Sequence, residues 1–268
     1  MISIIHRRFN MKKQGFTLAE VLITLGIVGV VAALTAPALV MSSRNEANAA
    51  RLSTVVSNME NAFQSAIAQE GADNLYGTSL WQENEISSQS NDNVIASFVG
   101  HLGQYMIING YKQNQANFYG NGIRTYAMSN TGGVGQEFNI PNTPFVIETK
   151  NGATIFIHTY RRNNLAVQRT EAINAGCTLY TRAADVAIDV NGKNSPNVFG
   201  RDIFFFILGE NGVLYPYGGR DTNRVIGNGL WDSPGLPFVC TDASKGISPW
   251  SGMGCTARVI AEGYKINY

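Results

Sequence analysis

The chain has 268 residues, of which 44% are hydrophobic and 15% are charged, so it can bury a core and is not a charge-rich disordered protein. Its formal net charge is +1, but Arg7, Arg8, Lys12 and Lys13 all precede Gly15, with no acidic residue in that stretch. Removing those four of the 20 basic side chains leaves 16 against 19 acidic ones, which gives no electrostatic reason to expect nucleic-acid binding.

An apolar segment follows this basic stretch. Val21 to Met41 is 21 residues without a charge, and as a helix it would span about 31 Å, the thickness of the hydrocarbon core of a bilayer. It has no polar stripe, so we expect it to face lipid for at least part of its life. Basic residues precede the span, whereas Arg44 and Glu46 balance each other after it. The N-terminus is therefore expected in the cytoplasm and the rest of the chain outside.

Glu20 stands at the edge of this span, where a carboxylate is costly unless it is paired. It closes the sequence Phe16-Thr17-Leu18-Ala19-Glu20, which follows Lys12-Lys13-Gln14-Gly15 and precedes the apolar run. Over residues 11–41 the chain resembles the leader and mature start of type IV pilins and type II secretion pseudopilins. The resemblance implies that a prepilin peptidase cuts between Gly15 and Phe16 and N-methylates Phe16.

Such a cut would create an α-ammonium at Phe16, four residues before Glu20, that could neutralise the carboxylate on the same or a neighbouring subunit. The alternative is a Glu20 side chain that reaches the lipid headgroups. The resemblance also implies that Glu20 guides assembly and that Pro37 loosens the helix, because its ring removes a backbone hydrogen bond. Met1 and Met11 both remain possible starts, since ten residues precede a leader of ordinary length.

An ordinary secretory signal is a competing interpretation of the same segment. Its charged region would be residues 7–13, its apolar region 21–34, and its cleavage site Ala36-Pro37-Ala38. A proline next to the cut and the unexplained Glu20 weigh against it.

Beyond the span, Leu52, Val55, Val56, Met59 and Phe63 recur with helical spacing. Gly71 is a plausible stop, so one helix is expected from Phe16 to about Glu70, with a length of about 80 Å. Its first half would lie in lipid or in a filament core, and its amphipathic second half against a folded domain.

Residues 71–140 are rich in Asn, Gly, Gln and Ser, and only a short helix within 91–106 is indicated there. Strand patterns then dominate, with hairpins at Asn151-Gly152 and Asn211-Gly212. A further strand is expected at 183–190, and a short helix or strand at 257–262. The expected fold is α+β and pilin-like, with the long N-terminal helix packed on an antiparallel sheet.

The loop from Asp189 to Asp202 carries the most suggestive chemistry. Oxygen donors at Asp189, Asn191, Asn197 and Asp202 could surround Ca²⁺, joined by backbone carbonyls. The alternative is a β-turn in which Asp202 pairs with Arg201 or Arg182.

The three cysteines, Cys177, Cys240 and Cys255, form no CxxC pair. Outside the cytoplasm they predict one disulfide and one leftover thiol, although three buried free thiols remain possible. Cys240 and Cys255 are closest in sequence and flank a Gly/Ser/Pro loop, which favours this pair, with a stabilisation of about 3 kcal/mol.

No catalytic residues are predicted. His6, His101 and His158 are isolated, and no nucleophile-elbow, zinc-protease, P-loop or dinucleotide motif appears in a suitable context. The aromatic residues Trp81, Tyr217, Trp231 and Trp250 are expected in exposed loops, where they could form a partner surface or cover the edge of a core.

These observations predict a structural subunit of a type II secretion pseudopilus or type IV pilus-like filament in the bacterial inner membrane, with its C-terminal domain periplasmic or extracellular. The expected partners are the prepilin peptidase, other pilin or pseudopilin subunits and the inner-membrane assembly platform. No cofactor is expected to be required, and Ca²⁺ is the candidate ligand. A filament-tip adhesin and a membrane-tethered envelope enzyme are the alternatives. The expected parts are a leader (1–15), a transmembrane and assembly helix (16–41), its amphipathic continuation (42–70) and a globular head (71–268).

Overall fold

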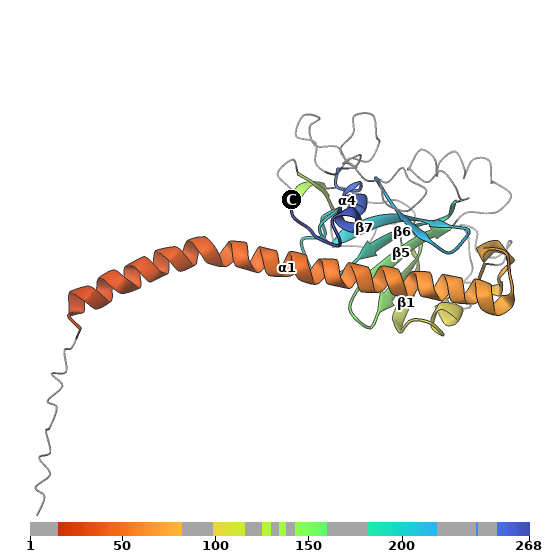
Figure 1. The fold of residues 1–268 in the computed structure, drawn as a ribbon, viewed down its shortest axis with the longest axis horizontal. Coiled ribbons are helices and arrows are strands. Elements are labelled where there is room, and N and C mark those ends of the chain that lie inside the picture. The colour runs from red at the N-terminus through yellow and green to blue at the C-terminus, as the bar shows by residue number, and fades with distance from the viewer. Residues whose placement is uncertain are drawn as a thin grey trace, which may run out of the picture. The chain divides into compact units, whose positions relative to one another are not determined.

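The structure of the chain is a computed structural model (Figure 1). It describes residues 16–81, 99–115, 125–129, 134–137, 143–159, 182–218, 240 and 251–268. The chain divides into two compact units, Met1–Arg44 and Asn45–Tyr268.

The helix α1 runs without interruption from Leu18 to Glu70 over 53 residues. This agrees with the single long helix expected from the sequence. It ends at Gly71, whose φ of +61° is the left-handed conformation that commonly terminates helices. In the first unit its apolar side chains are exposed, whereas in the second unit it carries a buried stripe.

The second unit is built on a six-stranded sheet in which every neighbouring pair is antiparallel. Its strands, in spatial order, are β1 (Ile108–Gln115), β4 (Thr143–Thr149), β5 (Thr154–Thr159), β6 (Arg182–Asp189), β7 (Ile203–Gly209) and β8 (Leu214–Pro216). A long helix on an antiparallel sheet confirms the α+β, pilin-like fold class.

Both predicted hairpins are present. β4 and β5 pair with Ile147 opposite Ile155, and β7 and β8 pair with Ile207 opposite Tyr215. Gly152 and Gly212 adopt φ values of +85° and +76°, which explains why the turns use Asn-Gly.

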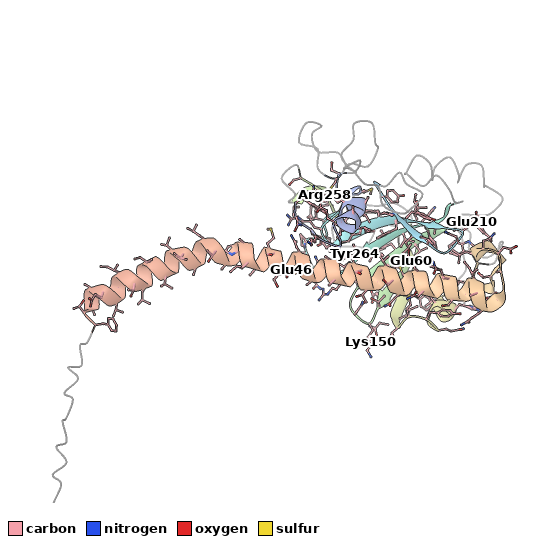
Figure 2. The ribbon with its side chains drawn as sticks, in the orientation of Figure 1. Glu46, Glu60, Lys150, Glu210, Arg258 and Tyr264 are labelled. Carbon is pink, nitrogen blue, oxygen red and sulfur yellow. A yellow bond between two sulfur atoms is a disulfide. The ribbon has the colours of Figure 1, made fainter. Side chains whose placement is uncertain are left out.

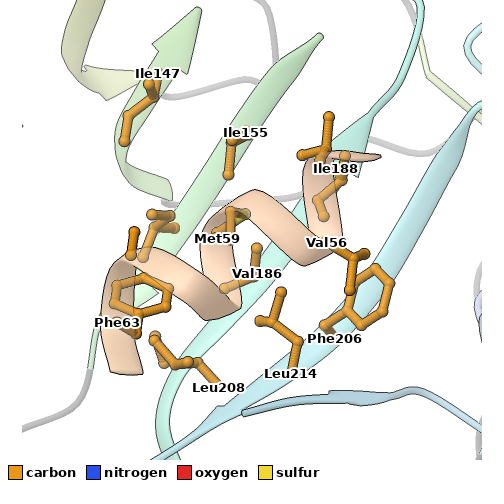
Figure 3. Packing of buried hydrophobic residues seen from close by; sticks show 14 of the residues in the cluster. Val56, Met59, Phe63, Ile147, Ile155, Val186, Ile188, Phe206, Leu208 and Leu214 are labelled. Atoms are coloured by element: carbon orange, nitrogen blue, oxygen red, sulfur yellow. The ribbon is translucent and has the colours of Figure 1, made fainter. Parts of the chain in front are cut away.

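The main core lies between the Asn45–Glu70 part of α1 and one face of the sheet (Figure 3). Met59 and Phe63 are fully buried there against alternate strand residues such as Val186. Each large apolar side chain removed from water contributes about 2 kcal/mol, so this stripe holds the helix on the sheet. The strand residues on this face are Ile147, Ile155, Ile157, Ala184, Val186, Ile188, Phe204, Phe206, Leu208 and Leu214.

A second apolar cluster lies on the other face of the sheet and includes Phe156, Phe205 and Tyr217. β7 contributes to both faces, and all seven of its residues are buried. This explains its continuous apolar sequence, because a central strand covered on both sides needs no polar alternation.

Polar side chains on α1 fix the helix relative to the sheet. Glu60 (labelled in Figure 2) accepts a hydrogen bond from the backbone N–H of Leu214 at 2.9 Å. Asn48 donates to the carbonyl of Arg201 at 3.3 Å, and Asn45 to that of Ile266 at 3.0 Å. These bonds join groups far apart in sequence and specify the position of α1 along the sheet.

Several elements differ from expectation. The polar sequence of β1 was not predicted as a strand, nor were β2 (Tyr126–Met128) and β3 (Val134–Glu137), which pair separately. The C-terminal segment, expected as a short helix or a strand, is the helix of these two alternatives, α4 (Cys255–Ala261), and is followed by Gly263 at φ +72°. Of the helix expected within 91–106, the described part is helical at 99–102.

The expectation of exposed loop aromatics is wrong for two of the four. Trp81 is 1% exposed and Tyr217 is 7% exposed, so both complete a core. Trp231 and Trp250 lie outside the described residues.

Candidate functional site

The first turn of α1 is closed by a reciprocal pair of side chains. Thr17 precedes the helix, and its N–H and hydroxyl both donate to Oε2 of Glu20, at 2.8 and 2.9 Å. In return, Thr17 Oγ1 accepts from the backbone N–H of Glu20 at 3.2 Å. This is a capping box, and it satisfies two N–H groups that a helix start otherwise leaves without partners.

The Glu20 carboxylate is therefore already hydrogen-bonded within its own chain, without a neighbouring subunit. Both bonds from Thr17 end on one carboxylate oxygen, Oε2. Phe16 lies just before this turn and is 87% exposed, while Gly15 and the leader lie outside the described residues. Cleavage would place an α-ammonium on Phe16, the residue next to Thr17, whose backbone N–H already donates to Glu20.

The apolar segment that follows is exposed on every side in the first unit. α1 is long and apolar enough to cross a membrane, and none of its most apolar stretch is buried within the protein. Pro37 lies inside this helix without ending it. The exposed large side chains are Leu18, Val21, Leu22, Ile23, Leu25, Ile27, Val28, Val30, Val31, Leu34, Leu39, Val40 and Met41.

Comparison with protein families gives one match. Residues 10–36 fit the prokaryotic N-terminal methylation motif, a signal characteristic of type IV pilins and pseudopilins. The motif supports a type IV pilin-like or pseudopilin subunit. Together with the apolar helix, it also supports anchoring of this pilin-like chain in a membrane. No curated protein and no solved structure matches the chain.

The loop between β6 and β7 brings together the four residues expected to bind calcium. Asp202 is 1% exposed, and its carboxylate accepts from the backbone N–H groups of Asn197, at 3.0 Å, and Val198. Asn191 Nδ2 approaches the same carboxylate at 3.4 Å. Burial nevertheless raises the pKa of Asp202 from its ordinary value of 3.8 to about 6, against the lowering effect of these donors.

Asn197 is the centre of the other half of the loop. It is 2% exposed and has a φ of 53°, a conformation that Asn tolerates better than most residues. Its carboxamide lies 3.1 Å from the carbonyl of Gly192, 3.0 Å from that of Asn194 and 3.3 Å from Oδ2 of Asp189. With its nitrogen turned toward these oxygens, Asn197 donates to all three. With the carboxamide oxygen of Asn197 turned toward these three oxygens instead, four oxygen atoms would face one another, and a cation would be needed between them.

The oxygen atoms around Asn197 are better suited to bind a hard cation than the carboxylate of Asp202. Asp189 is fully buried, and the buried Oδ1 of Asn191 has no hydrogen-bond partner among the described residues. Asp202, by contrast, already accepts several N–H groups. Among the described residues, no group of three or more His, Cys, Asp or Glu side chains could hold a metal ion, so a site here would depend on amide and carbonyl oxygens.

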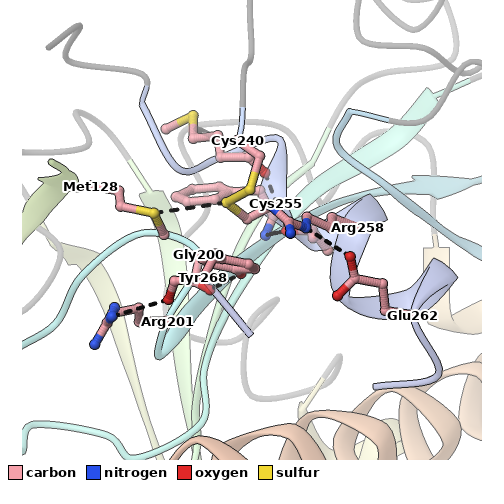
Figure 4. The surroundings of a disulfide bond; sticks show 11 residues. Met128, Gly200, Arg201, Cys240, Cys255, Arg258, Glu262 and Tyr268 are labelled. Carbon is pink, nitrogen blue, oxygen red and sulfur yellow. Dashed lines mark hydrogen bonds and ion pairs between the residues drawn. A yellow bond between two sulfur atoms is a disulfide. The ribbon is translucent and has the colours of Figure 1, made fainter. Parts of the chain in front are cut away.

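The Cys240–Cys255 pair, favoured from the sequence, is joined by a disulfide (Figure 4). Both cysteines are buried, and Met128 Sδ lies 4.0 Å from Cys255 Sγ. The neighbouring loop passes very close, because a Cβ added at Gly200 would lie 2.7 Å from Cys255 Cβ and from the carbonyl oxygen of Gly252. Cys177 lies outside the described residues.

His101 lies next to a hydrogen-bonded pair of polar side chains, Ser79 and Glu70. Ser79 Oγ lies 3.2 Å from Nε2 of His101 but donates its hydrogen to Glu70 Oε1 at 2.6 Å. The bond from the Ser79 hydroxyl lowers the pKa of Glu70. His101 therefore does not activate Ser79 as a nucleophile, and the cluster fastens the end of α1 to the segments that follow it. His158, on β5, lies opposite Asp185 on β6.

Thr17 was not predicted as a partner of Glu20. The signal was present, because Thr-x-x-Glu at a helix start is the pattern of a capping box. Gly192 and Asn194, which face Asn197 through their backbone carbonyls, were not predicted either, because no residue type marks such a contribution.

Proposed function

We propose that the chain is a structural subunit of a type II secretion pseudopilus or a type IV pilus-like filament, processed after Gly15 and assembled through α1. The observation that carries this proposal is the methylation motif at residues 10–36, placed directly on an exposed apolar helix with a capped start. An apolar helix without a buried face needs lipid or other helices around it.

Assembly exchanges lipid contacts for protein contacts along residues 16–41. Dispersion contacts with neighbouring helices replace those with acyl chains, and Glu20 sets the register between subunits. Its Oε2 is occupied by Thr17, and the rest of the carboxylate is available for the α-ammonium of a neighbouring Phe16. A charge-assisted bond of this kind in an apolar medium favours one stagger of the helices over others.

The proposal implies several partners. The prepilin peptidase cleaves before Phe16, the inner-membrane assembly platform extracts the helix, and copies or relatives of the chain pack beside it. The head lies on the periplasmic or extracellular side, which the basic residues before the span favour. A disulfide in the head agrees with that side, because thiols in the cytoplasm are kept reduced.

Intact mass spectrometry of the native chain, with and without the peptidase of its host, tests this function. The proposal requires a chain that starts at N-methylated Phe16 only when the peptidase is present. A chain that starts at Leu39, or that keeps its leader in both cases, would overturn it and point to a secreted or tethered domain.

Calcium binding is a separate proposal for the loop at 189–202. The side chains of Asp189 and Asn197 with the carbonyls of Gly192 and Asn194 would supply the ligands. Oxygens that share one Ca²⁺ at about 2.4 Å lie about 3 Å apart, and the Asn197 carboxamide atom that faces the loop lies 3.0 to 3.3 Å from each of the other three oxygens. Bound calcium would offset the buried negative charge of Asp189 and would hold the loop closed.

A further inference from the structure

The head carries a surface groove of about 330 Å³ between α1 and the turn that joins β4 to β5. The buried residues Val55, Met106 and Thr149 form its floor. The other lining residues are exposed: Thr54, Asn58, Ile107, Lys150 and Asn151. A ligand in such a groove keeps one side in water, which suits a protein segment laid across it better than an enclosed small molecule.

Ile107 gives the groove an apolar lip. Its side chain is 67% exposed, although isoleucine is among the residue types most often buried. It continues the apolar floor of Val55 and Met106 toward solvent. The backbone N–H of Lys150 donates to the carbonyl of Ile107 at 3.2 Å and so fastens the lip to the turn. An apolar side chain that covered Ile107 would remove this surface from water, which is the main driving force for association.

The polar side chains of the groove are placed to donate hydrogen bonds. Lys150 stands exposed at the outer end of the turn (Figure 2), and within the described part of the chain neither its ammonium nor the Asn58 carboxamide has a partner. Asn151 Oδ1 accepts from the N–H of Ala153 at 3.3 Å and from the Thr149 hydroxyl. The Nδ2 group of Asn151 is thereby turned away from these bonds and is left for a ligand.

The charges beside the groove are positive. Arg51 is exposed and lies three residues before Thr54, so helical spacing places the two on the same side of α1. Among the described residues neither Arg51 nor Lys150 has an ion pair, and none of the eight lining residues carries a carboxylate. Glu148 points to the opposite face of β4, where it pairs with Lys193 at 3.1 Å. An anionic group is therefore the complement of this surface.

We propose that the groove binds a segment of another protein in which an apolar side chain lies next to a carboxylate. The apolar side chain covers Ile107 and Val55, and the carboxylate accepts hydrogen bonds from Lys150 and Asn151, with Arg51 nearby. A charge-assisted hydrogen bond beside an apolar contact fixes the orientation of the segment as well as its affinity. The proposal goes beyond the filament function, which uses residues 16–41, and does not depend on it.

The described surface of a second copy does not offer such a segment. In the described part of the head, the exposed large apolar side chains are Ile107, Tyr111 and Val134. None of them has an acidic residue at the next position on either side. A different protein is therefore the occupant that the observations favour.

The test uses the full chain in nonionic detergent and, as the probe, a phage-displayed library of random peptides. We expect the selected peptides to carry Asp or Glu next to a large apolar residue. The affinity of such a peptide, measured by fluorescence anisotropy, should fall at least about tenfold in Lys150→Glu and in Ile107→Asp. Lys265→Glu is the matched control, because Lys265 is exposed outside the groove and the change of charge is the same. All three replaced side chains are exposed, and equal Tm values would show that the variants are folded.

Reversal of the charge on both sides makes the test specific. A peptide whose acidic residue is replaced by Lys should lose its affinity for the native chain and regain it for Lys150→Glu. Selected peptides without an acidic residue, or peptides that bind native chain, Ile107→Asp and Lys150→Glu equally, would overturn the proposal. So would p-benzoylphenylalanine in place of Ile107 that cross-links the chain in cells only to a second copy. These variants leave residues 1–41 unchanged, so failure here and failure of N-terminal processing are separate results.

Discussion

Thr17 and Glu20 hold each other at the first turn of α1 through three hydrogen bonds. Two run from the Thr17 N–H and hydroxyl to Glu20 Oε2, and one from the Glu20 N–H back to Thr17 Oγ1. A carboxylate at the edge of an apolar span is thereby partly satisfied inside its own helix, which lowers the cost of keeping it there before a partner arrives.

Replacing Thr17 by Val should weaken assembly while leaving the charge of Glu20 in place. The helix start would lose the side-chain half of its cap, which costs about 1 kcal/mol, and the Glu20 carboxylate would keep only the backbone N–H of residue 17 as a donor. We expect a several-fold lower filament yield, with Thr17→Ser close to the native yield. The measurement is the amount of chain in sheared filaments, with mass spectrometry of the N-terminus to show that cleavage is unchanged.

Thr24→Val is the matched control, because the Thr24 hydroxyl donates to the carbonyl of Val21, at 3.0 Å, and bonds to no carboxylate within the described part of the chain. Equal losses in Thr17→Val and Thr24→Val would show that any change of polarity in the span has this effect, and the capping box would then have no special role.

The parts of the fold that could be predicted are those specified by neighbouring residues. The Asn-Gly turns at 151–152 and 211–212 set both hairpins locally, and the apolar stripe set the buried face of α1. β1 was missed because its sequence, INGYKQNQ, is polar. As an edge strand it gains its order from pairing with β4, and that information lies about 35 residues away.

The candidate functional residues also fall into a part that could be predicted from the sequence and a part that could not. The methylation motif is contiguous, so Gly15, Phe16 and Glu20 could be named from the sequence. The four loop residues could also be named, but their roles could not. Asp202 stabilises the loop because its carboxylate accepts hydrogen bonds from backbone N–H groups. Asn197 lies in the middle of the candidate calcium site because two backbone carbonyls face it. Neither arrangement can be recognised from the types of residue in the sequence.

Asn197→Asp separates the two possible arrangements of the loop. Without calcium, a second carboxylate facing Asp189 and two carbonyls should lower the Tm, because the amide donor is lost. If the loop binds Ca²⁺, millimolar calcium should restore the Tm of this variant and raise it more than that of the native chain, since a charged ligand binds calcium more tightly.

Asp189→Ala should remove any rise in Tm caused by calcium in the native chain. Thermal melts with calcium and with a chelator make this comparison directly. Identical Tm values under both conditions, in the native chain and in Asn197→Asp, would sink the calcium proposal and leave a hydrogen-bonded turn.

The Asp202 carboxyl should make the stability of the head depend on pH. Its pKa is raised from 3.8 to about 6, so between these values the folded state holds a proton that the unfolded state has lost. Stability is therefore full below pH 3.8 and falls as the pH rises through 6, by about 3 kcal/mol at 1.4 kcal/mol for each pKa unit.

Denaturant unfolding of the full chain in detergent from pH 4 to 7 measures this contribution of Asp202 to the free energy of unfolding. Asp202→Asn is the reference, because it cannot titrate at this position and shares every other ionisable group. The advantage of the native chain over this variant should shrink by about 3 kcal/mol across the range. Two parallel curves would mean that Asp202 titrates near its ordinary pKa.

Gly200→Ala should be among the most damaging single-methyl changes in the head. Its φ of +81° already disfavours any side chain, and the new Cβ would lie 2.7 Å from Cys255 Cβ and Met128 Cε. We expect a loss of at least about 3 kcal/mol and an incompletely formed disulfide, because residue 200 could no longer pack against Cys255 and Gly252. Gly152→Ala is the matched control, since it has a φ of +85° but open space around it, and should cost about 1 kcal/mol. Similar losses in the two variants, measured as Tm and as free thiols after alkylation, would show that backbone conformation alone sets the effect and that the contact with Cys255 does not matter.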